Sequence, residues 1–499
     1  MVVQHNMQAA NANRMLNVTT SAQSKSTEKL SSGYRINRAA DDAAGLTISE
    51  KMRKQIRGLD QASTNAQDGV SSVQTAEGAL TEVHSMLQRM NELATQAANG
   101  TNSKDSDRQA IQDEIDQLTT EIDRVSETTK FNETYLLKGE AGTKKINMKA
   151  HDAGLKGTLT DNGDGTATFV MDTLNAGDKV SIGGKSYTIG SDDTDVNTWF
   201  TDNKITDTKD NKVTVNGTEY TYVGATAATG TAGAITAGWY AKTPTAPADK
   251  NASTTPDFAN VDKIKEAINK GGTAQVGTKT VTGMNDKNNA AGAAGVDGVS
   301  DTDATVISKK KAYELASKEL LKANQIGDTE NSAKVGVGAV DKPVSLTNGT
   351  GTFQIQTGSA KVANSLSFSL HVGADADMTN KIQVNIDAMD SASLGIKGLN
   401  VKDASGNAAT YAVDAISDAI SKVSSQRSSL GAVQNRLEHT INNLDNVVEN
   451  TTTAESRIRD TDMAEEMVNY SKNNILAQAG QSMLAQANQS NQGVLSLLQ

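Results

Sequence analysis

All four prolines of this chain lie in its middle, and their distribution limits where long helices can form. Proline lacks a backbone N–H and its ring clashes with the preceding turn, so it interrupts the interior of a helix. These prolines are Pro244, Pro247, Pro256 and Pro343. Residues 1–140 and 405–499 contain none. The two ends can therefore form long helices, and the middle can adopt another structure.

Apolar residues in both ends recur with alternating spacings of four and three, the pattern of helices that pack along a seam. Three segments show it, at 73–97, 111–125 and 416–448. The first consists of Val73, Ala76, Leu80, Val83, Leu87, Met90, Ala94 and Ala97. This spacing places the side chains on one helix face. Because no stripe can bury itself alone, the sequence predicts a long antiparallel coiled-coil bundle formed by N- and C-terminal helices.

Composition and charge exclude several classes of site. The chain has no cysteine, so it has no disulfide, no thiolate nucleophile and no Cys-ligated metal. A formal net charge of -11 argues against general nucleic-acid binding, which requires a basic surface. We also expect no cleavable signal peptide and no membrane insertion, because no basic start precedes an apolar core and no window of about 18 apolar residues occurs.

Residues 141–400 have a different composition, rich in Gly, Thr, Asp, Asn and Lys. Segments 158–171, 179–189 and 212–222 each predict a β-hairpin around a glycine turn, and the third contains the Asn-Gly pair typical of a type I′ turn. Short helices are expected near 259–270 and 306–324. The sequence thus predicts a β-rich α+β insert that faces solvent.

No group of residues predicts catalysis or a metal site. The five histidines are scattered, and none forms the helical pair that binds zinc beside a general base. Residues 161–165 have the oxygen density of a calcium loop but not its twelve-residue spacing or terminal glutamate, so they predict a plain turn. We therefore expect no enzyme activity, no cofactor and no metal.

A charged connector follows the first helical segment. Gly33 is expected to break the helix, and Arg35 and Arg38 precede Asp41 and Asp42. This arrangement predicts a connector held by ion pairs.

The extreme ends have only thin apolar stripes. The stripe of the first segment includes Val3 and Met7. The last segment also has a face rich in Asn and Gln. The apolar residues of the last segment are Ile475, Met483, Val494, Leu495 and Leu498. Such stripes suit close helix-to-helix contact in a polymer. The alternative interpretation is a disordered tail.

Several motifs in these ends resemble those of the bacterial flagellins. At the N-terminal end they are Leu-Ser-Ser-Gly-Tyr-Arg-Ile-Asn at 30–37 and Asp-Asp-Ala-Ala-Gly at 41–45. At the C-terminal end they are Leu-Gly-Ala-Val-Gln-Asn-Arg-Leu at 430–437 and Ser-Arg-Ile-Arg-Asp at 456–460. They occur in the same order as in that family, and the resemblance covers both ends but not the central insert.

The resemblance implies a subunit that is exported unfolded through the hollow flagellar structure and polymerises beneath a distal cap into an extracellular filament for swimming. It implies an inner-tube helical domain, in which the apolar residues named above at the two ends pack in the filament core. It also implies a coiled-coil bundle domain and a surface-exposed outer part. These three parts are residues 1–42 with 456–499, residues 43–172 with 404–455, and residues 173–403. The implied partners are further copies of the chain, the flagellar cap and hook-junction proteins, and a cytoplasmic export chaperone that grips the C-terminus.

The resemblance also implies a contact with Toll-like receptor 5. The matching positions are Gln88, Arg89 and Leu93 on one helix and Glu114 on the next. The other interpretation, compatible with the first, is that they face neighbouring subunits. Two alternative classes are a hook–filament junction protein and a flagellin with a protease insert. The missing zinc-binding histidine pair argues against the second class.

Overall fold

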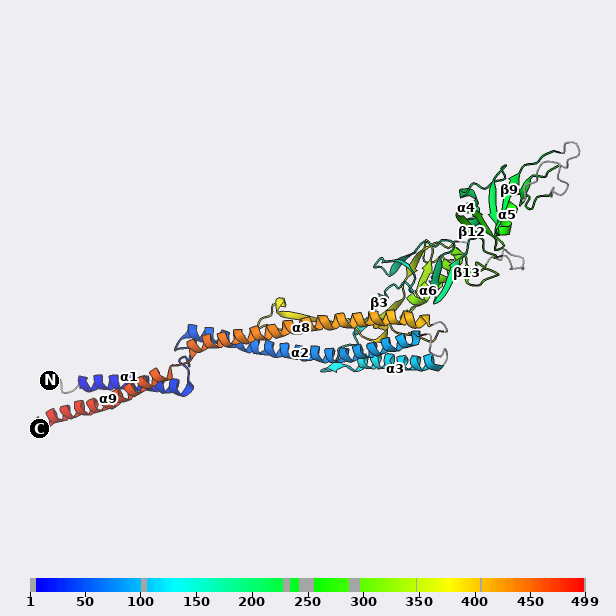
Figure 1. Cartoon of the computed structure of the whole chain (residues 1–499). Coiled ribbons are helices and arrows are strands. Elements are labelled where there is room, and N and C mark those ends of the chain that lie inside the picture. The colour runs from blue at the N-terminus through cyan, green and yellow to red at the C-terminus, as the bar shows by residue number, and fades with distance from the viewer. Residues whose placement is uncertain are drawn as a thin grey trace. The chain divides into compact units, whose positions relative to one another are not determined.

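The structure, a computed structural model, has long helices at both ends of the chain and a β-rich middle (Figure 1). It describes residues 6–99, 106–227, 234–241, 255–286, 297–346, 348–403 and 406–497. Contacts divide the chain into two compact units. The first contains Met1–Gln74, Ser367–Asn385 and Ser429–Gln499, and the second contains Thr75–Leu366 and Ile386–Ser428. This division differs from the three parts expected above, which remain a prediction.

Four long helices form in the proline-free ends. They are α1 (Met7–Ser32), α2 (Ala43–Ala98), α8 (Asn407–Arg459) and α9 (Met463–Leu497). The predicted seam of α2 is confirmed, because all eight of its residues from Val73 to Ala97 are fully buried. Leu430 and Leu437 of α8 are also fully buried. Apolar spacing thus determines which face of each helix is covered.

Helices α2 and α8 pack against each other in antiparallel orientation. In the first unit the Ser63 hydroxyl donates to the Asp445 carboxylate at 3.2 Å. In the same unit the Ser49 hydroxyl donates to the Glu455 carboxylate at 2.7 Å. The order of these contacts along the two helices is opposite, which confirms that N- and C-terminal helices lie side by side.

Helix α3 (Ser106–Thr128) folds back on α2, as the sequence predicts. Its buried residues include Ile115 and Ile122. The buried Arg108 guanidinium donates to the Ala97 carbonyl at 3.0 Å and to the Asp403 carbonyl at 2.8 Å. It therefore satisfies a carbonyl that the end of α2 leaves without a helical partner.

Two sheets and one helix form the larger β-rich core of the second unit. The first sheet has the order β14-β15-β5-β4 and the second the order β13-β7-β6. The first comprises β14 (Lys334–Gly336), β15 (Thr352–Gln356), β5 (Thr166–Met171) and β4 (Gly157–Asp161). The second comprises β13 (Val306–Ile307), β7 (Lys185–Ile189) and β6 (Lys179–Ile182). The hairpins β4–β5 and β6–β7 confirm the first two predicted hairpins.

Helix α6 (Lys309–Asn324) packs on this core, which is centred on the stacked rings of Phe169 and Phe353, 6.2 Å apart. The expected helix at 306–324 is shorter because its first two residues form β13. The Ser308 side chain accepts the Lys311 amide and begins the helix there.

A five-stranded sheet with two helices forms a separate small core in the same unit. Its order is β10-β9-β8-β11-β12. The elements are β8 (Lys212–Val215), β9 (Thr218–Val223), β10 (Gly238–Tyr240), β11 (Thr273–Val276), β12 (Lys279–Thr282), α4 (Asp193–Asp202) and α5 (Val261–Ile268). Trp239 is completely buried in this core. Asn216 and Gly217 both have positive φ, 49° and 84°, as a type I′ turn requires, so the third predicted hairpin is confirmed.

The other short elements join these parts. They are β1 (Lys130–Phe131), β2 (Thr134–Tyr135), β3 (Glu140–Asn147), β16 (Ser359–Asn364), β17 (Leu366–His371), β18 (Lys381–Ile386), α7 (Ser391–Leu394) and the 3-10 helix at Met378–Asn380. Strands β16 and β3 pair, as do β17 and β18. Among the described helices, none is both long and apolar enough to cross a membrane.

Candidate self-assembly surface

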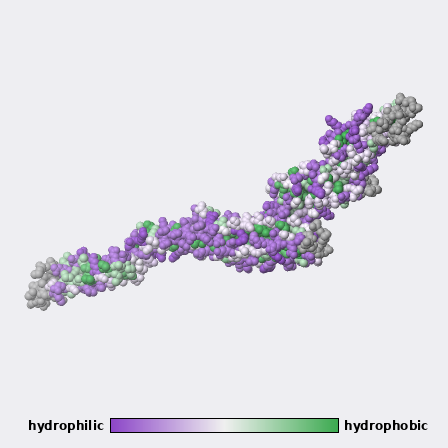
Figure 2. Space-filling view, viewed as in Figure 1, coloured by the Kyte–Doolittle hydropathy of each residue, from purple (hydrophilic) through white to green (hydrophobic). Residues whose placement is uncertain are grey.

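Helices α1 and α9 form a pair that leaves its apolar side chains largely uncovered. Met7 is 73% exposed, Ile475 67% and Met483 64%. Figure 2 shows hydrophobic residues on the surface of this pair. A monomeric protein rarely leaves an apolar stripe of this kind in water. The pair therefore presents a surface suited to helix-to-helix contact.

Polar contacts between α1 and α9 lie near both ends of the pair. The Asn6 side chain accepts the Ala9 amide at 2.9 Å, which caps α1, and donates to the Ala487 carbonyl at 3.2 Å. Lys29 lies 3.8 Å from the Glu466 carboxylate.

Some of the residues expected to pack in the filament core lie outside the part of the chain that the structure describes. Val3 and Leu498 lie outside the described residues, and the side chains of Val494 and Leu495 at the end of α9 also do. Met7, Ile475 and Met483 are the described members, and their packing in a filament stays a prediction.

The connector between α1 and α2 is held mainly by backbone groups. Gly33 ends α1 with a φ of 75°, a left-handed conformation that glycine adopts without strain. Tyr34 forms a β-bridge with Asp460, and the Thr461 amide donates to the Gly33 carbonyl at 3.0 Å. The Arg459 guanidinium lies over the Tyr34 ring, 4.6 Å from its centroid. The connector is thus joined to the segment between α8 and α9.

Arg35 and Arg38, expected to pair with the two aspartates, have other partners. The Arg35 side chain donates to the carbonyls of Arg457 and Ile458. Arg38 forms its ion pair with Glu28, at 2.9 Å. Within the described part of the chain, neither arginine is within ion-pair distance of either aspartate. The partners of Arg35 lie far away in sequence, and the partner of Arg38 lies on the preceding helix. The local spacing of charges therefore revealed neither.

Asp41 and Asp42 accept hydrogen bonds from backbone amides. Asp41 accepts from Arg38 at 2.9 Å and from Asn37 at 3.2 Å. The hydrogen bond from the Arg38 amide lowers the pKa of Asp41 below its ordinary value. Asp42 accepts the Gly45 amide at 2.9 Å, near the first turn of α2. The aspartates therefore shape the turn and begin the helix.

Three of the four expected receptor-contact residues form an exposed polar ridge on α2 and α3. The exposed Arg89 lies 2.8 Å from Glu114 and 3.2 Å from Glu92. The hydrogen bond to Glu114 raises the pKa of Arg89. The Gln88 side chain lies within hydrogen-bond distance, 3.1 Å, of the His84 ring. The sequence analysis did not include Glu92, although it lies three residues after Arg89 on the same helix face.

Leu93 belongs to the core instead of the ridge. Its side chain is only 2% exposed, because it follows Met90 by three residues and shares the buried face of α2. Leu93 can stabilise the helix that carries the ridge by packing in the core, but it does not present its side chain at the surface.

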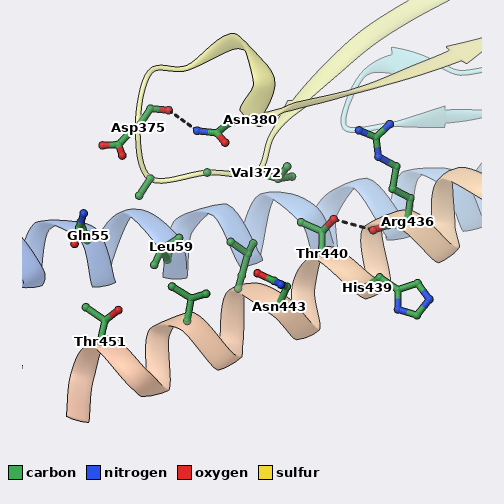
Figure 3. Close-up of a pocket in the computed structure, with 14 residues that line it drawn as sticks. Gln55, Leu59, Val372, Asp375, Asn380, Arg436, His439, Thr440, Asn443 and Thr451 are labelled. Carbon is green, nitrogen blue, oxygen red and sulfur yellow. Dashed lines mark hydrogen bonds between the residues drawn. The ribbon is translucent and has the colours of Figure 1, made fainter. Parts of the chain in front are cut away.

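A groove lies in the first unit where the β17–β18 hairpin crosses α2 and α8 (Figure 3). Val372 and Ile382 of the hairpin pack with Ala66 of α2 and Leu437 of α8. Two glycines allow this approach. A Cβ atom on Gly69 would lie 2.2 Å from Leu370 Cδ1, and one on Gly58 would lie 3.0 Å from Ala374 Cβ.

Both polar and apolar side chains line the groove, and the sequence analysis did not identify it. The hairpin lies in the range 173–403 that we expected on the outside, yet it packs on the helices. Across the described ranges, no cluster of three or more potential metal ligands occurs.

The helical ends, the exposed stripe of α1 and α9 and the β-rich insert define a structural subunit with a helical core. Residues 3–141 match the family model of the bacterial flagellin N-terminal helical region, and residues 413–498 match that of the C-terminal helical region. The chain belongs to the bacterial flagellins, which are structural subunits of the extracellular flagellar filament.

Full-length relatives support this assignment. Flagellin of Clostridium tyrobutyricum is 38% identical over 497 residues, which cover 99% of this chain and 100% of that protein. Flagellin of Bacillus subtilis (strain 168) is 33% identical over 499 residues and all of both chains. Flagellin D of Vibrio cholerae is 32% identical over 496 residues, with 99% of each chain covered. The similarity thus extends beyond the two helical regions to the insert.

Proposed function

We propose that this chain polymerises into the swimming filament through the exposed apolar side chains of α1 and α9. The observation that supports this most is the exposure of Met7, Ile475 and Met483 in a single chain. Burying one such side chain contributes about 1.5–3 kcal/mol, so neighbouring copies that cover them would stabilise a polymer strongly.

The test is seeded polymerisation followed by sedimentation. Replacing Ile475→Ser and Met483→Ser together should raise the critical concentration at least about 100-fold, since each 1.4 kcal/mol corresponds to about tenfold. Gln481→Ser is the matched control, because it changes an exposed residue of the same helix without removing apolar area. If the double variant pellets like the full chain, α9 does not drive assembly.

The same assay separates the filament from the hook–filament junction. A junction protein should stay monomeric even when filament seeds are added, and its partner would then be sought at the hook. The full-length similarity to flagellins favours the filament.

We further propose that the ridge of Gln88, Arg89 and Glu114 is the contact for Toll-like receptor 5. Its residues are exposed, and the Arg89–Glu114 ion pair joins α2 to α3 within it. Leu93 would act only by supporting this surface, because it is buried. In a receptor reporter assay, Arg89→Ala should reduce signalling at least about tenfold, as expected for an arginine that anchors an interface. Glu82→Ala is the control, since Glu82 is exposed on the same helix; an equal loss there would contradict the assignment.

The remaining partners follow from the state of α9 before assembly. We propose that the cytoplasmic export chaperone covers the apolar stripe of α9, and that the cap and hook-junction proteins receive it during assembly. Co-purification of the chaperone with the full chain, and its loss in the Ile475→Ser and Met483→Ser variant, would support the first of these contacts. A chaperone that still binds this variant would place its site elsewhere.

A further inference from the structure

The turn of the β17–β18 hairpin carries a small acidic surface with one apolar side chain. Asp375 and Asp377 are exposed, and Met378 is 73% exposed. Asp377 accepts the Thr379 amide at 3.0 Å, and this hydrogen bond lowers the pKa of its carboxyl. The turn is therefore negatively charged at neutral pH. It is called the acidic turn below and comprises residues 375–378.

The opposite end of the groove carries one cationic side chain, Arg436, beside His439. Figure 3 shows Asp375 at one end, and Arg436 and His439 of α8 at the other. Both of these α8 residues are exposed. Among the residues that the structure describes, neither Asp375 nor Arg436 takes part in an ion pair. One chain thus presents two surfaces of opposite charge that do not neutralise each other.

A helical polymer needs two different contact patches on each copy. Its neighbours are related by a rotation and a shift along the axis, so each contact joins two different patches, one from each copy. We propose that the acidic turn of one copy docks against the Arg436 end of the groove in a neighbouring copy, with Met378 covered in the contact. This inference rests on the proposed function, because it assumes that the chain polymerises.

A second copy fits this surface better than a small ligand does. The polar and charged side chains that line the groove are exposed or half-buried, so the lining has no buried charged group that would fix a small molecule. It also belongs to the same compact unit as α1 and α9, which carry the exposed apolar stripe. Opposite charges at such a contact set the register between copies and favour the correct neighbour.

The test is a charge exchange in the full chain, measured by the critical concentration for seeded polymerisation at low salt. Asp375→Lys and Arg436→Glu should each raise it about 3–10-fold, since exposed ion pairs contribute little individually and reversal adds repulsion. The two changes combined should restore it to within about twofold. At roughly 1 M salt the single variants should approach the unmodified chain, because screening then acts over about 3 Å.

Lys51→Glu is the matched control, an exposed charge reversal on α2 outside the groove lining. Circular dichroism of the monomers checks that each variant is folded. The proposal is overturned if the single variants polymerise like the unmodified chain, if Lys51→Glu has an equal effect, or if the combined variant is no better than the single ones. If the unmodified chain itself fails to polymerise with seeds, the proposed function fails, and that result is distinct from the other three.

Discussion

Alanine substitution of three glycines in α2 should change the stability in opposite directions, depending on the helix face on which the glycine lies. Gly58 and Gly69 are eleven residues apart, which places them on the same face, and Gly78 follows nine residues later on the opposite face. A Cβ atom on Gly78 would meet no atom within 4 Å apart from the neighbouring backbone of its own helix. Gly78→Ala should therefore stabilise the helix by about 0.5–1 kcal/mol, the ordinary gain of alanine over glycine.

The same substitution at Gly69 should not increase the stability. Its Cβ atom would lie 2.2 Å from Leu370 Cδ1 and 3.3 Å from Leu437 Cδ1, within the small core under the hairpin. Leu370 must leave its position, and overpacking of this kind costs about 1–3 kcal/mol. The net effect is a destabilisation of about 0–2.5 kcal/mol. At Gly58 the new Cβ atom would meet the Ala374 Cβ at 3.0 Å and its Cα at 3.1 Å, so the hairpin backbone itself must move.

Two measurements on the monomer would separate these effects. Denaturant unfolding followed by helical circular dichroism gives the stability, and hydrogen exchange of residues 366–386 reports whether the hairpin stays on the helices. We expect faster exchange in Gly58→Ala and Gly69→Ala, and unchanged exchange in Gly78→Ala. If all three variants gained stability equally and the hairpin exchanged at its original rate, the hairpin would not be packed on α2 as described.

Two further predictions concern the core of the second unit. Leu87→Ala removes a fully buried seam residue and should destabilise the bundle by about 2–5 kcal/mol in urea unfolding, whereas the exposed Ser85→Ala should change stability by less than about 0.5 kcal/mol. Asp328 is partly desolvated, which raises its pKa, but the backbone amides of Ala333, Ser359 and Glu330 outweigh this effect and lower it. Since the folded pKa is the lower one, its contribution to stability is present above the unfolded value of about 3.9 and is lost as pH falls through the folded pKa. In Asp328→Asn, the melting temperature should therefore fall less steeply as the pH is lowered through this range. A melting temperature with the same pH dependence as in the unmodified chain would contradict this role of Asp328.

The seams could be predicted from the sequence because helix period is a local property. Residues from Val73 to Ala97 each follow the last by three or four positions, and all are buried. Leu93 shares that rhythm, so its burial could also have been predicted from the seam itself. The turn at Asn216 and Gly217 was equally local, since two residues with positive φ suffice to define it.

The connector and the groove could not be predicted in the same way, because their partners are distant in sequence. Arg35 donates to carbonyls more than 400 residues away, and a list of nearby charges does not contain them. The alternation in 366–386 indicates strands but not the surface on which they lie. The eleven-residue spacing of Gly58 and Gly69 was the available signal, since two glycines on one helix face allow the close approach of another backbone.

The thin stripes of α1 and α9 lead to a last prediction, about the state of these helices before assembly. Among the side chains described in the pair, only Ser26 and Ala477 are buried. A helix gains most of its stability from packing an apolar face, so a pair with so little burial should open often in the monomer. We expect amides in 7–32 and 463–490 to exchange rapidly in the monomer and to become strongly protected in the filament, while those of 75–98 are protected in both. Equal protection of the terminal helices in monomer and filament would show that they are stable without neighbours, and the argument from exposed apolar surface to self-assembly would lose its physical basis.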